Sequence, residues 1–183
     1  MRIVAGQFGG RRLAALGKGD ASAHLRPTPD RVRESLFSLL THRGALDGAR
    51  VLDLFAGTGA LGLEALSRGA DHVTFVENGR TGGRLIADNI RALDCAEDTR
   101  LLRMDATRLG PNAADPYTLV FLDPPYGKGL GGRSLAAAQA GGWLAPAALI
   151  VWEENAPQPA PEGFAALDTR RFGDTTLTLL EAP

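Results

Sequence analysis

The sequence has little of several features that define whole classes of protein. It holds one cysteine, Cys95, so neither an internal disulfide nor a cysteine-rich metal site can form. No apolar run approaches the roughly 18 residues of a membrane span, and the first residues lack the apolar stretch of a signal peptide. The three histidines are scattered, with no second ligand at helical spacing, so we predict no metal site. These absences favour a cytoplasmic protein.

The formal net charge is small, but the charges are unevenly distributed. Residues 1–43 contain eight basic and three acidic residues, whereas residues 44–183 contain 12 basic and 18 acidic ones. A basic segment on a mildly acidic body can dock onto phosphate groups, so a nucleic-acid partner stays open. The alternative is a solvated, arginine-rich surface with no partner.

The chain of 183 residues, 44% of them hydrophobic, is sufficient for one sizeable core and too short for two full domains. Asp30 is placed to cap a helix that runs to about residue 41. Strand and helix patterns then alternate, which predicts an α/β fold: a Rossmann-like, mostly parallel sheet of seven strands with helices on both faces. The expected strands are 50–54, 72–77, 100–104, 118–122 and 148–153, then a C-terminal antiparallel hairpin of 164–172 and 175–181; the expected helices after the first strand are 61–68, 80–93 and 131–140.

A glycine-rich turn follows the first predicted strand. Gly57, Gly59 and Gly62 match the G-x-G-x-x-G spacing of dinucleotide sites, where the backbone turns tightly against a ligand. Glu77 lies at the end of the next predicted strand, where a carboxylate can accept both hydrogen bonds from a ribose diol. The pattern alone therefore permits a nicotinamide enzyme.

The residues just before this turn favour S-adenosylmethionine instead. Asp53 is predicted to end the strand, and Phe55 and Ala56 separate it from the first glycine. A carboxylate beside the turn repels a pyrophosphate, but it suits the cationic amino group of a methionine moiety. The sequence thus predicts a cofactor site for S-adenosylmethionine.

Asp123-Pro124-Pro125-Tyr126 stands at the carboxyl end of a solidly apolar strand. In open α/β sheets ligands bind at this edge. An aromatic amino group is a poor nucleophile, and two acceptors on its N–H bonds free its lone pair. Asp123 and the carbonyl of Pro124 can supply those acceptors, and Tyr126 can stack on the target base. The pattern indicates methyl transfer to an amino nitrogen; a stiff turn without function is the alternative.

These two stretches resemble known motifs. The glycine-rich turn is similar to the cofactor motif of class I methyltransferases, and the resemblance implies Glu77 on the ribose hydroxyls and Asp105 near the adenine amino group. Asp105 can also be a simple turn former. Asp-Pro-Pro-Tyr resembles the signature of enzymes that methylate adenine N6, cytosine N4, guanine N2 or a protein glutamine.

The N-terminal residues make the resemblance more specific. Residues 2–6, 10–13 and 26–37, the last reading Arg-Pro-Thr-Pro-Asp-Arg-Val-Arg-Glu-Ser-Leu-Phe, look like the start of the RsmD family, and residues 61–70 extend the match. Members of that family are 16S ribosomal RNA (guanine(966)-N2)-methyltransferases. The resemblance implies a substrate guanine in small-subunit RNA, within an assembling or assembled 30S particle, and we expect a monomer.

The resemblance also suggests a division of the chain. Residues 1–43 would form a basic N-terminal extension that contacts RNA, and residues 44–183 the methyltransferase domain. Six cations are the candidate RNA contacts: Arg11, Arg12, Arg26, Arg31, Arg33 and Lys128.

Three local features are less easily interpreted. Gly79, Gly82 and Gly83 make the start of the second core helix unusually rich in glycine. Asn89 in that helix is expected to form a structural hydrogen bond, and residues 153–155 can lie near the site. The remaining alternatives are an adenine-N6 or cytosine-N4 methyltransferase, a non-catalytic RNA-binding assembly factor, and a nicotinamide oxidoreductase.

Overall fold

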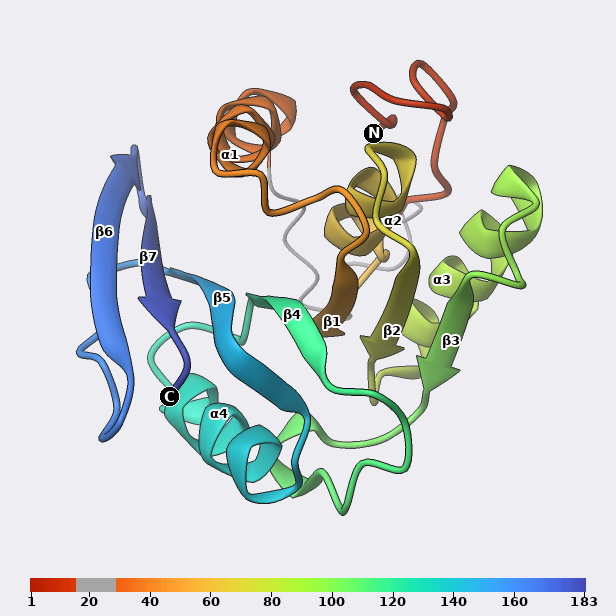
Figure 1. The fold of residues 1–183 in the computed structure, drawn as a ribbon. Coiled ribbons are helices and arrows are strands. Elements are labelled where there is room, and N and C mark those ends of the chain that lie inside the picture. Colours follow the sequence, from red (N-terminus) through yellow and green to blue (C-terminus); the bar gives the residue numbers. More distant parts are fainter. Residues whose placement is uncertain (16–28) are drawn as a thin grey trace.

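Strands and helices alternate along the chain as predicted (Figure 1). The computed structural model describes residues 1–15 and 29–183. Most elements begin and end within two residues of the predicted bounds; the fifth strand begins four residues earlier. The elements are α1 (Asp30–His42), β1 (Arg50–Leu54), α2 (Ala60–Ser67), β2 (His72–Val76), α3 (Arg80–Leu93), β3 (Thr99–Leu102), the 3₁₀ helix η2 (Ala106–Arg108), β4 (Tyr117–Leu122), α4 (Leu130–Ala140), β5 (Leu144–Glu154), β6 (Ala165–Phe172) and β7 (Thr175–Glu181).

The strands form one seven-stranded sheet in the order β3-β2-β1-β4-β5-β7-β6. Strands β3, β2, β1, β4 and β5 are parallel, and β7 runs antiparallel to both of its neighbours, β5 and β6. The predicted Rossmann-like sheet with a C-terminal hairpin is therefore confirmed. The chain proceeds outward from β1 to β3 and then returns to β4 on the other side of β1. This reversal leaves the carboxyl ends of β1 and β4 side by side, the position where such sheets bind ligands.

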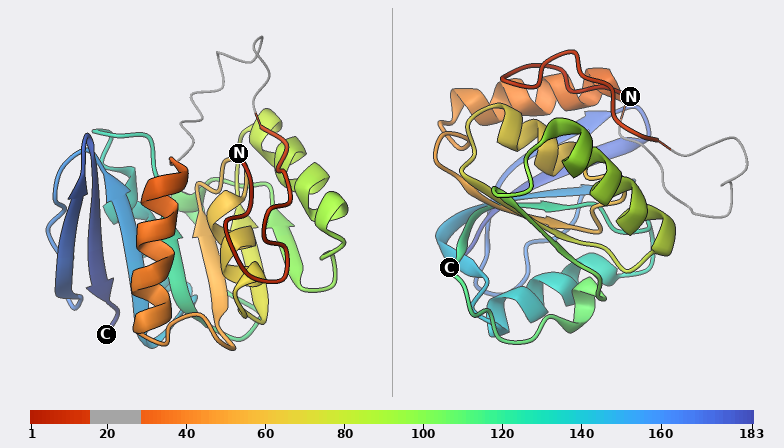
Figure 2. Two further views of the ribbon diagram at one scale, coloured as in Figure 1. Left: turned by 90° about the horizontal axis from the view of Figure 1, so that it is seen from above. Right: turned by 90° about the vertical axis from the view of Figure 1, so that its right-hand side faces the viewer.

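Helices cover both faces of the sheet, as the two views of Figure 2 show. Alternate residues of each strand point to opposite faces, so Val51 of β1 packs with α1, α2 and α3, whereas Leu52 packs with α4. Both side chains are fully buried. Burial of each such side chain stabilises the fold by roughly 1.5–3 kcal/mol. Among the described residues, no helix is long and apolar enough to cross a membrane.

The start of α1 differs from the prediction. The helix begins at Asp30, and the residue before it, Pro29, forms no side-chain cap. The Asp30 carboxylate instead pairs with Arg33, one turn later, with 2.5 Å between Oδ1 and Nη2. The prediction that Asp30 caps this helix was therefore wrong, because its carboxylate is used by a buried cation.

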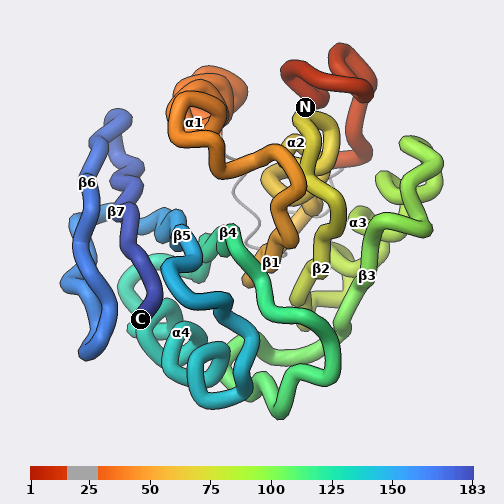
Figure 3. The backbone as a smooth tube through the Cα atoms, in the orientation of Figure 1, coloured from red at the N-terminus to blue at the C-terminus, as the bar shows by residue number. Residues whose placement is uncertain are grey.

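The N-terminal segment, residues 1–15, packs against α2 and α3 (Figure 3). Its two halves meet at a single antiparallel bridge between Arg2 and Arg12. The fully buried Glu64 of α2 accepts hydrogen bonds from the backbone N–H groups of Val4, at 2.7 Å, and Ala5, at 3.1 Å. Arg68 donates to the same carboxylate at 2.7 Å. One buried acid thus fastens the segment to α2.

Replacing Glu64 by alanine should release this segment. Two backbone donors and the Arg68 guanidinium would lose their acceptor, so we expect a loss of about 2–3 kcal/mol in the free energy of unfolding. Hydrogen exchange at residues 1–15 should accelerate. The control is Asp88→Ala, which removes the exposed pair of Asp88 and Arg91 and should cost less than about 1 kcal/mol. Equal melting temperatures for the two variants would contradict this role of Glu64.

Candidate active site

The carboxyl ends of four neighbouring strands bring the predicted site residues together. The ladder of β2, β1, β4 and β5 ends in register. The residues that follow its last common row therefore lie side by side, and they are Glu77, Phe55, Asp123 and Glu153. The backbone N–H of Asp123 still donates to Leu54 of β1, at 3.4 Å, which continues the ladder. Three carboxylates thus occupy one edge.

The turn after β1 has a tight backbone. Phe55, Gly57 and Gly59 all have positive φ, of 59°, 58° and 76°. This conformation suits glycine but strains a phenylalanine, at a cost of roughly 1–3 kcal/mol. The N–H of Gly59 donates to the carbonyl of Ala56 at 2.7 Å, and α2 begins at the next residue. The turn is therefore held in one shape at the carboxyl edge of the sheet.

Glu77 organises this turn. Its Oε2 accepts from the N–H of Gly57 at 2.9 Å, and its Oε1 accepts from the N–H of Gly79 at 2.6 Å. The side chain is 8% exposed. Each carboxylate oxygen has two lone pairs, so each keeps one for a further donor. Glu77 therefore both shapes the turn and retains acceptor sites at the edge.

The glycine-rich start of α3 is explained by its contact with Glu77. A Cβ on Gly82 would lie 2.9 Å from the Cδ of Glu77 and 2.9 Å from the carbonyl oxygen of Gly57. A Cβ on Gly83 would lie 3.0 Å from the guanidinium of Arg103. The sequence showed only weak helix formers here. The structure shows that these glycines let α3 approach Glu77 and the glycine-rich turn closely.

Asp53 lies beneath the turn rather than beside it. It is an interior residue of β1, whose last residue is Leu54, and its side chain is 2% exposed. Its Oδ2 accepts from the N–H of Gly62 at 3.0 Å, which holds the first turn of α2. Burial raises the pKa of Asp53 from its ordinary value of 3.8 to about 8; the bond from Gly62 lowers it and the charge of Glu77 raises it. The prediction that Asp53 ends the strand was wrong by one residue, because β1 ends at Leu54.

Asp105 caps the short helix η2 that follows β3. Its Oδ1 accepts from the N–H and from the hydroxyl of Thr107, both at 2.8 Å. These bonds, and the charges of Arg108 and Arg133, lower the pKa of Asp105. The turn-forming role is therefore present, and the side chain also lies at the carboxyl edge.

Asn89 is fully buried and links three parts of the chain. From α3 it donates to the carbonyl of Thr58 in the glycine-rich turn at 2.9 Å. It also accepts from the N–H of Ala14 at 2.6 Å and donates to the carbonyl of the same residue at 3.3 Å. The expected structural hydrogen bond is confirmed, and Asn89 ties the N-terminal segment to the glycine-rich turn.

The Asp-Pro-Pro-Tyr turn is anchored by acids of β5. The hydroxyl of Tyr126 donates to Oε1 of Glu153 at 3.1 Å, and the N–H of Gly127 donates to Oε1 of Glu154 at 3.2 Å. Both acids are 5% exposed. Burial, and then the charge of Glu153, raise the pKa of Tyr126 to about 12, so the phenol stays protonated at neutral pH. Pro124 is buried and Asp123 is half-buried.

Glu153 and Glu154 are thus positioning residues that the sequence indicated only by their place after a strand. Their contacts join β5 to a loop that follows β4, and no short-range pattern reports such a contact.

The predicted RNA contacts lie in different surroundings. Arg12, Arg31 and Lys128 are exposed, as a phosphate contact requires. Arg11 is exposed but donates to the carbonyls of Ala92 and Leu93 at the end of α3. Arg26 lies outside the described residues.

Arg33 has no exposed surface, so its prediction as a phosphate contact was wrong. Its Nη2 donates to the carbonyl of Arg2 at 2.7 Å and to Asp30. Helical spacing places it on the same apolar face as Leu36, Phe37 and Leu40, a signal that was available in the sequence. Arg33 fastens α1 to the N-terminal segment.

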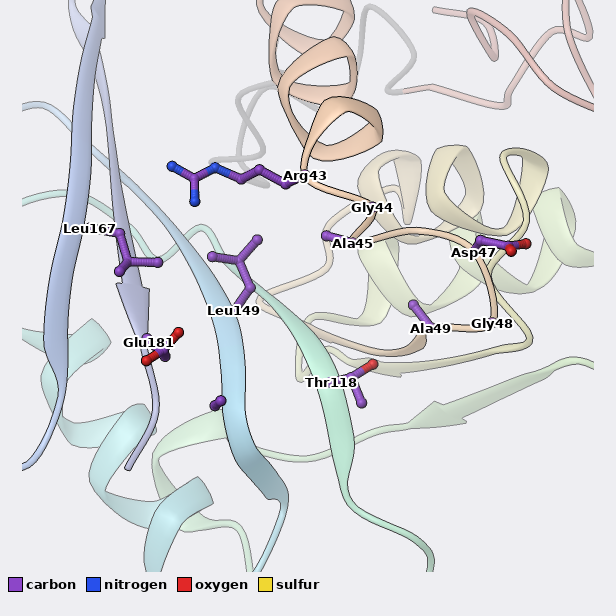
Figure 4. Close-up of a pocket in the computed structure, with 11 residues that line it drawn as sticks. Arg43, Gly44, Ala45, Asp47, Gly48, Ala49, Thr118, Leu149, Leu167 and Glu181 are labelled. Carbon is purple, nitrogen blue, oxygen red and sulfur yellow. The ribbon is translucent and has the colours of Figure 1, made fainter.

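A groove of about 430 Å³ lies at the opposite, amino edge of the sheet (Figure 4). Arg43, Leu149 and Leu167 point toward one another across it. None of the predicted site residues lines it. The chemistry-bearing side chains therefore gather at the carboxyl edge and not in this groove. Within residues 1–15 and 29–183, no group of three potential metal ligands occurs.

Replacing Gly82 by alanine should weaken cofactor binding. The new methyl group would press on Glu77 and on the backbone of Gly57, so α3 or the turn must shift. We expect at least a tenfold loss of affinity for S-adenosylhomocysteine by calorimetry, about 1.4 kcal/mol or more. Gly132→Ala is the matched control, because its nearest neighbour, in Trp152, lies at 3.9 Å. Equal affinities for both variants would contradict the explanation that Gly82 is required by its close contact with Glu77.

Replacing Asp53 by asparagine should stabilise the protein increasingly as pH rises. The pKa of Asp53 is about 8 in the folded protein and near 3.8 in the unfolded chain. The wild-type protein therefore loses stability as pH rises between these two values. Asparagine keeps an acceptor for Gly62 and cannot ionise. The melting-temperature gain should therefore grow from pH 5 to about pH 8, whereas Asp105→Asn, where the pKa is lowered, should show no such gain. A melting-temperature gain that does not change with pH would contradict the raised pKa of Asp53.

Comparison with known proteins identifies the family. The chain matches the family described as Conserved hypothetical protein 95 over residues 1–181. A relative, the Ribosomal RNA small subunit methyltransferase D of Escherichia coli strain K12, is 38% identical over 161 residues, which cover 88% of this chain and 78% of the relative. A solved structure, a putative methyltransferase (yhhF) from Escherichia coli, has a TM-score of 0.83 at 34% identity and covers 100% of this chain and 97% of that one.

A more distant structure supports the fold alone. An RNA methyltransferase from Salinibacter ruber, in complex with S-adenosyl-L-homocysteine, has a TM-score of 0.65 at 18% identity, over 86% of this chain and 94% of that chain. The family match includes both the N-terminal segment and the sheet. The chain belongs to this family, the RsmD family of methyltransferases that its N-terminal motif and its Asp-Pro-Pro-Tyr turn predicted.

Proposed function

We propose that this protein transfers a methyl group from S-adenosylmethionine to the exocyclic N2 amino group of a guanine in small-subunit ribosomal RNA. The observation that carries the proposal is the row at the carboxyl edge, where Asp123 stands beside the cofactor turn and Glu77. The names of the relatives, ribosomal RNA small subunit methyltransferases, support the substrate class. The proposed setting is the cytoplasm, with an assembling or assembled 30S particle as substrate.

The residues at this edge fit S-adenosylmethionine. The oxygens of Glu77 each accept one backbone N–H and keep a lone pair for the two hydroxyls of a ribose. Asp105 accepts from Thr107 with Oδ1, and its Oδ2 is 4.0 Å from the Nε of Arg108, so an adenine amino group can approach it. The residues that would hold the cofactor are Phe55, Ala56, Gly57, Gly59, Glu77 and Asp105, with Asp53 supporting α2 from beneath.

Asp123 and Pro124 act on the target nitrogen. When bound, the cofactor supplies an electrophilic methyl group. Asp123 and the carbonyl of Pro124 accept the two N–H bonds of the amino group, which draws its lone pair out of conjugation with the ring. Asp123 then takes the proton that the nitrogen releases once it has bonded to the methyl carbon.

Tyr126 positions the base. Its hydroxyl is fixed by Glu153, at 3.1 Å, so the ring is held in one orientation and can stack on the target guanine. Because its pKa is raised to about 12, this hydroxyl remains a donor well above neutral pH. Positioning of this kind contributes to catalysis because the nitrogen must approach the methyl carbon in line.

The basic extension, residues 1–43, is proposed as part of the RNA contact through the exposed Arg12 and Arg31. It also shares the core of residues 44–183, because Leu36 and Phe37 of α1 pack in the same cluster as Val51 of β1. The extension therefore shares one hydrophobic core with the sheet.

The test is transfer of a labelled methyl group to small subunits from a strain that lacks this gene, followed by nucleoside analysis. Wild-type protein should place the label in N2-methylguanosine. Asp123→Ala should reduce transfer at least a thousandfold and leave the affinity for S-adenosylhomocysteine within a few fold, because Asp123 acts on the acceptor. The control is the exposed Asp115→Ala, which should retain activity.

Two results would contradict the proposal. Label in N6-methyladenosine or N4-methylcytidine would move the protein to the other base class. Transfer by Asp123→Ala at the wild-type rate would show that the Asp123 carboxylate takes no part in the reaction.

A further inference from the structure

Exposed cations follow the carboxyl ends of β2, β3 and β4, three of the parallel strands. Arg80 follows β2 at the start of α3, Arg103 and Arg108 follow β3, and Lys128 and Arg133 follow β4 around the start of α4. All five are exposed, and the side chain of Arg108 is 82% exposed, whereas Arg103 also donates to the carbonyl of Gly83 at 3.3 Å. We name them the carboxyl-edge cations. They surround the edge at which the target base must enter.

Two of these cations converge on one point. Arg108 lies 4.0 Å from Asp105, measured from Nε to Oδ2. Arg133 comes from the first turn of α4, which packs against η2, and its charge acts on the same carboxylate. One acid beside two guanidinium groups leaves a net positive charge. The start of α4 has no side-chain cap, so its first N–H groups also favour an anion.

The N-terminal cations that the sequence favoured are less available. Arg33 is buried, and Arg11 donates to carbonyls at the end of α3. That end of α3 lies at the amino edge, because α3 runs antiparallel to the strands it connects. Of the predicted N-terminal contacts that the structure describes, Arg12 and Arg31 remain as exposed cations.

We infer that the phosphates of the substrate RNA bind the carboxyl-edge cations, with Arg108 and Arg133 as the central pair. This inference rests on the proposed function, since it assumes that RNA is the substrate. It assigns docking to loops that follow β2, β3 and β4. The exposed N-terminal cations then have a secondary role.

The test compares two double variants in binding small-subunit ribosomal RNA over a salt series. Arg108→Ala with Arg133→Ala should weaken binding about tenfold or more at 0.1 M salt, and should reduce the slope of log affinity against log salt by about 1.4–1.8. The matched control, Arg91→Ala with Arg100→Ala, removes two exposed cations at the other ends of α3 and β3 and should leave both values unchanged. Melting temperatures establish that both variants fold.

Unchanged affinity and slope for the Arg108 and Arg133 variant would overturn the inference. So would a larger loss on replacing Arg11 and Arg12 by alanine, which would move the docking surface to the N-terminal segment. Failure of the proposed function is distinguishable, because wild-type protein would then bind the RNA without forming N2-methylguanosine. The binding comparison stands independently of that result.

Discussion

The site depends on the close packing of the Glu77 carboxylate between two backbone segments, the turn after β1 and the start of α3. Glu77 accepts from Gly57 in the turn after β1 and from Gly79 before α3, so a single buried acid sets the distance between two elements. Gly82 makes this possible, because any side chain there would meet both Glu77 and the turn. The same carboxylate faces the edge where a ribose diol would bind. The same carboxylate therefore holds α3 against the turn and offers acceptors to a ligand. A movement of α3 would alter the site.

The other elements support this arrangement from three directions. Asp53 holds the first turn of α2 from beneath, Asn89 ties the turn to α3 and to Ala14, and Glu153 fixes Tyr126 from β5. Each support is a buried polar group whose partner is a backbone group or a hydroxyl, and such groups specify one arrangement because leaving them unpaired is costly. The Asp-Pro-Pro-Tyr turn and the glycine-rich turn are thus positioned by neighbouring strands and helices and not by their own short sequences.

Much of this could be predicted from the sequence, and the failures have physical causes. The period of the apolar residues predicted the strands and the seven-stranded sheet, and glycine spacing located the turn. Asp53 was misplaced because a shift of one residue in a strand reverses the direction of a side chain. Arg33 was taken as a surface cation although helical spacing placed it on the apolar face. The roles of Gly82 and Glu153 arise from contacts between distant segments, and no local pattern carries that information.

The most direct test of this account is a crystal structure of the protein with S-adenosylhomocysteine. We predict that both ribose hydroxyls lie within hydrogen-bond distance of Glu77, that the bonds from Gly57 and Gly79 are retained, and that Asp123 faces the sulfur end of the ligand. A ligand bound away from the ends of β1 and β2, or a Glu77 side chain released from both glycines to reach it, would contradict the claim that one contact sets both the packing and the site.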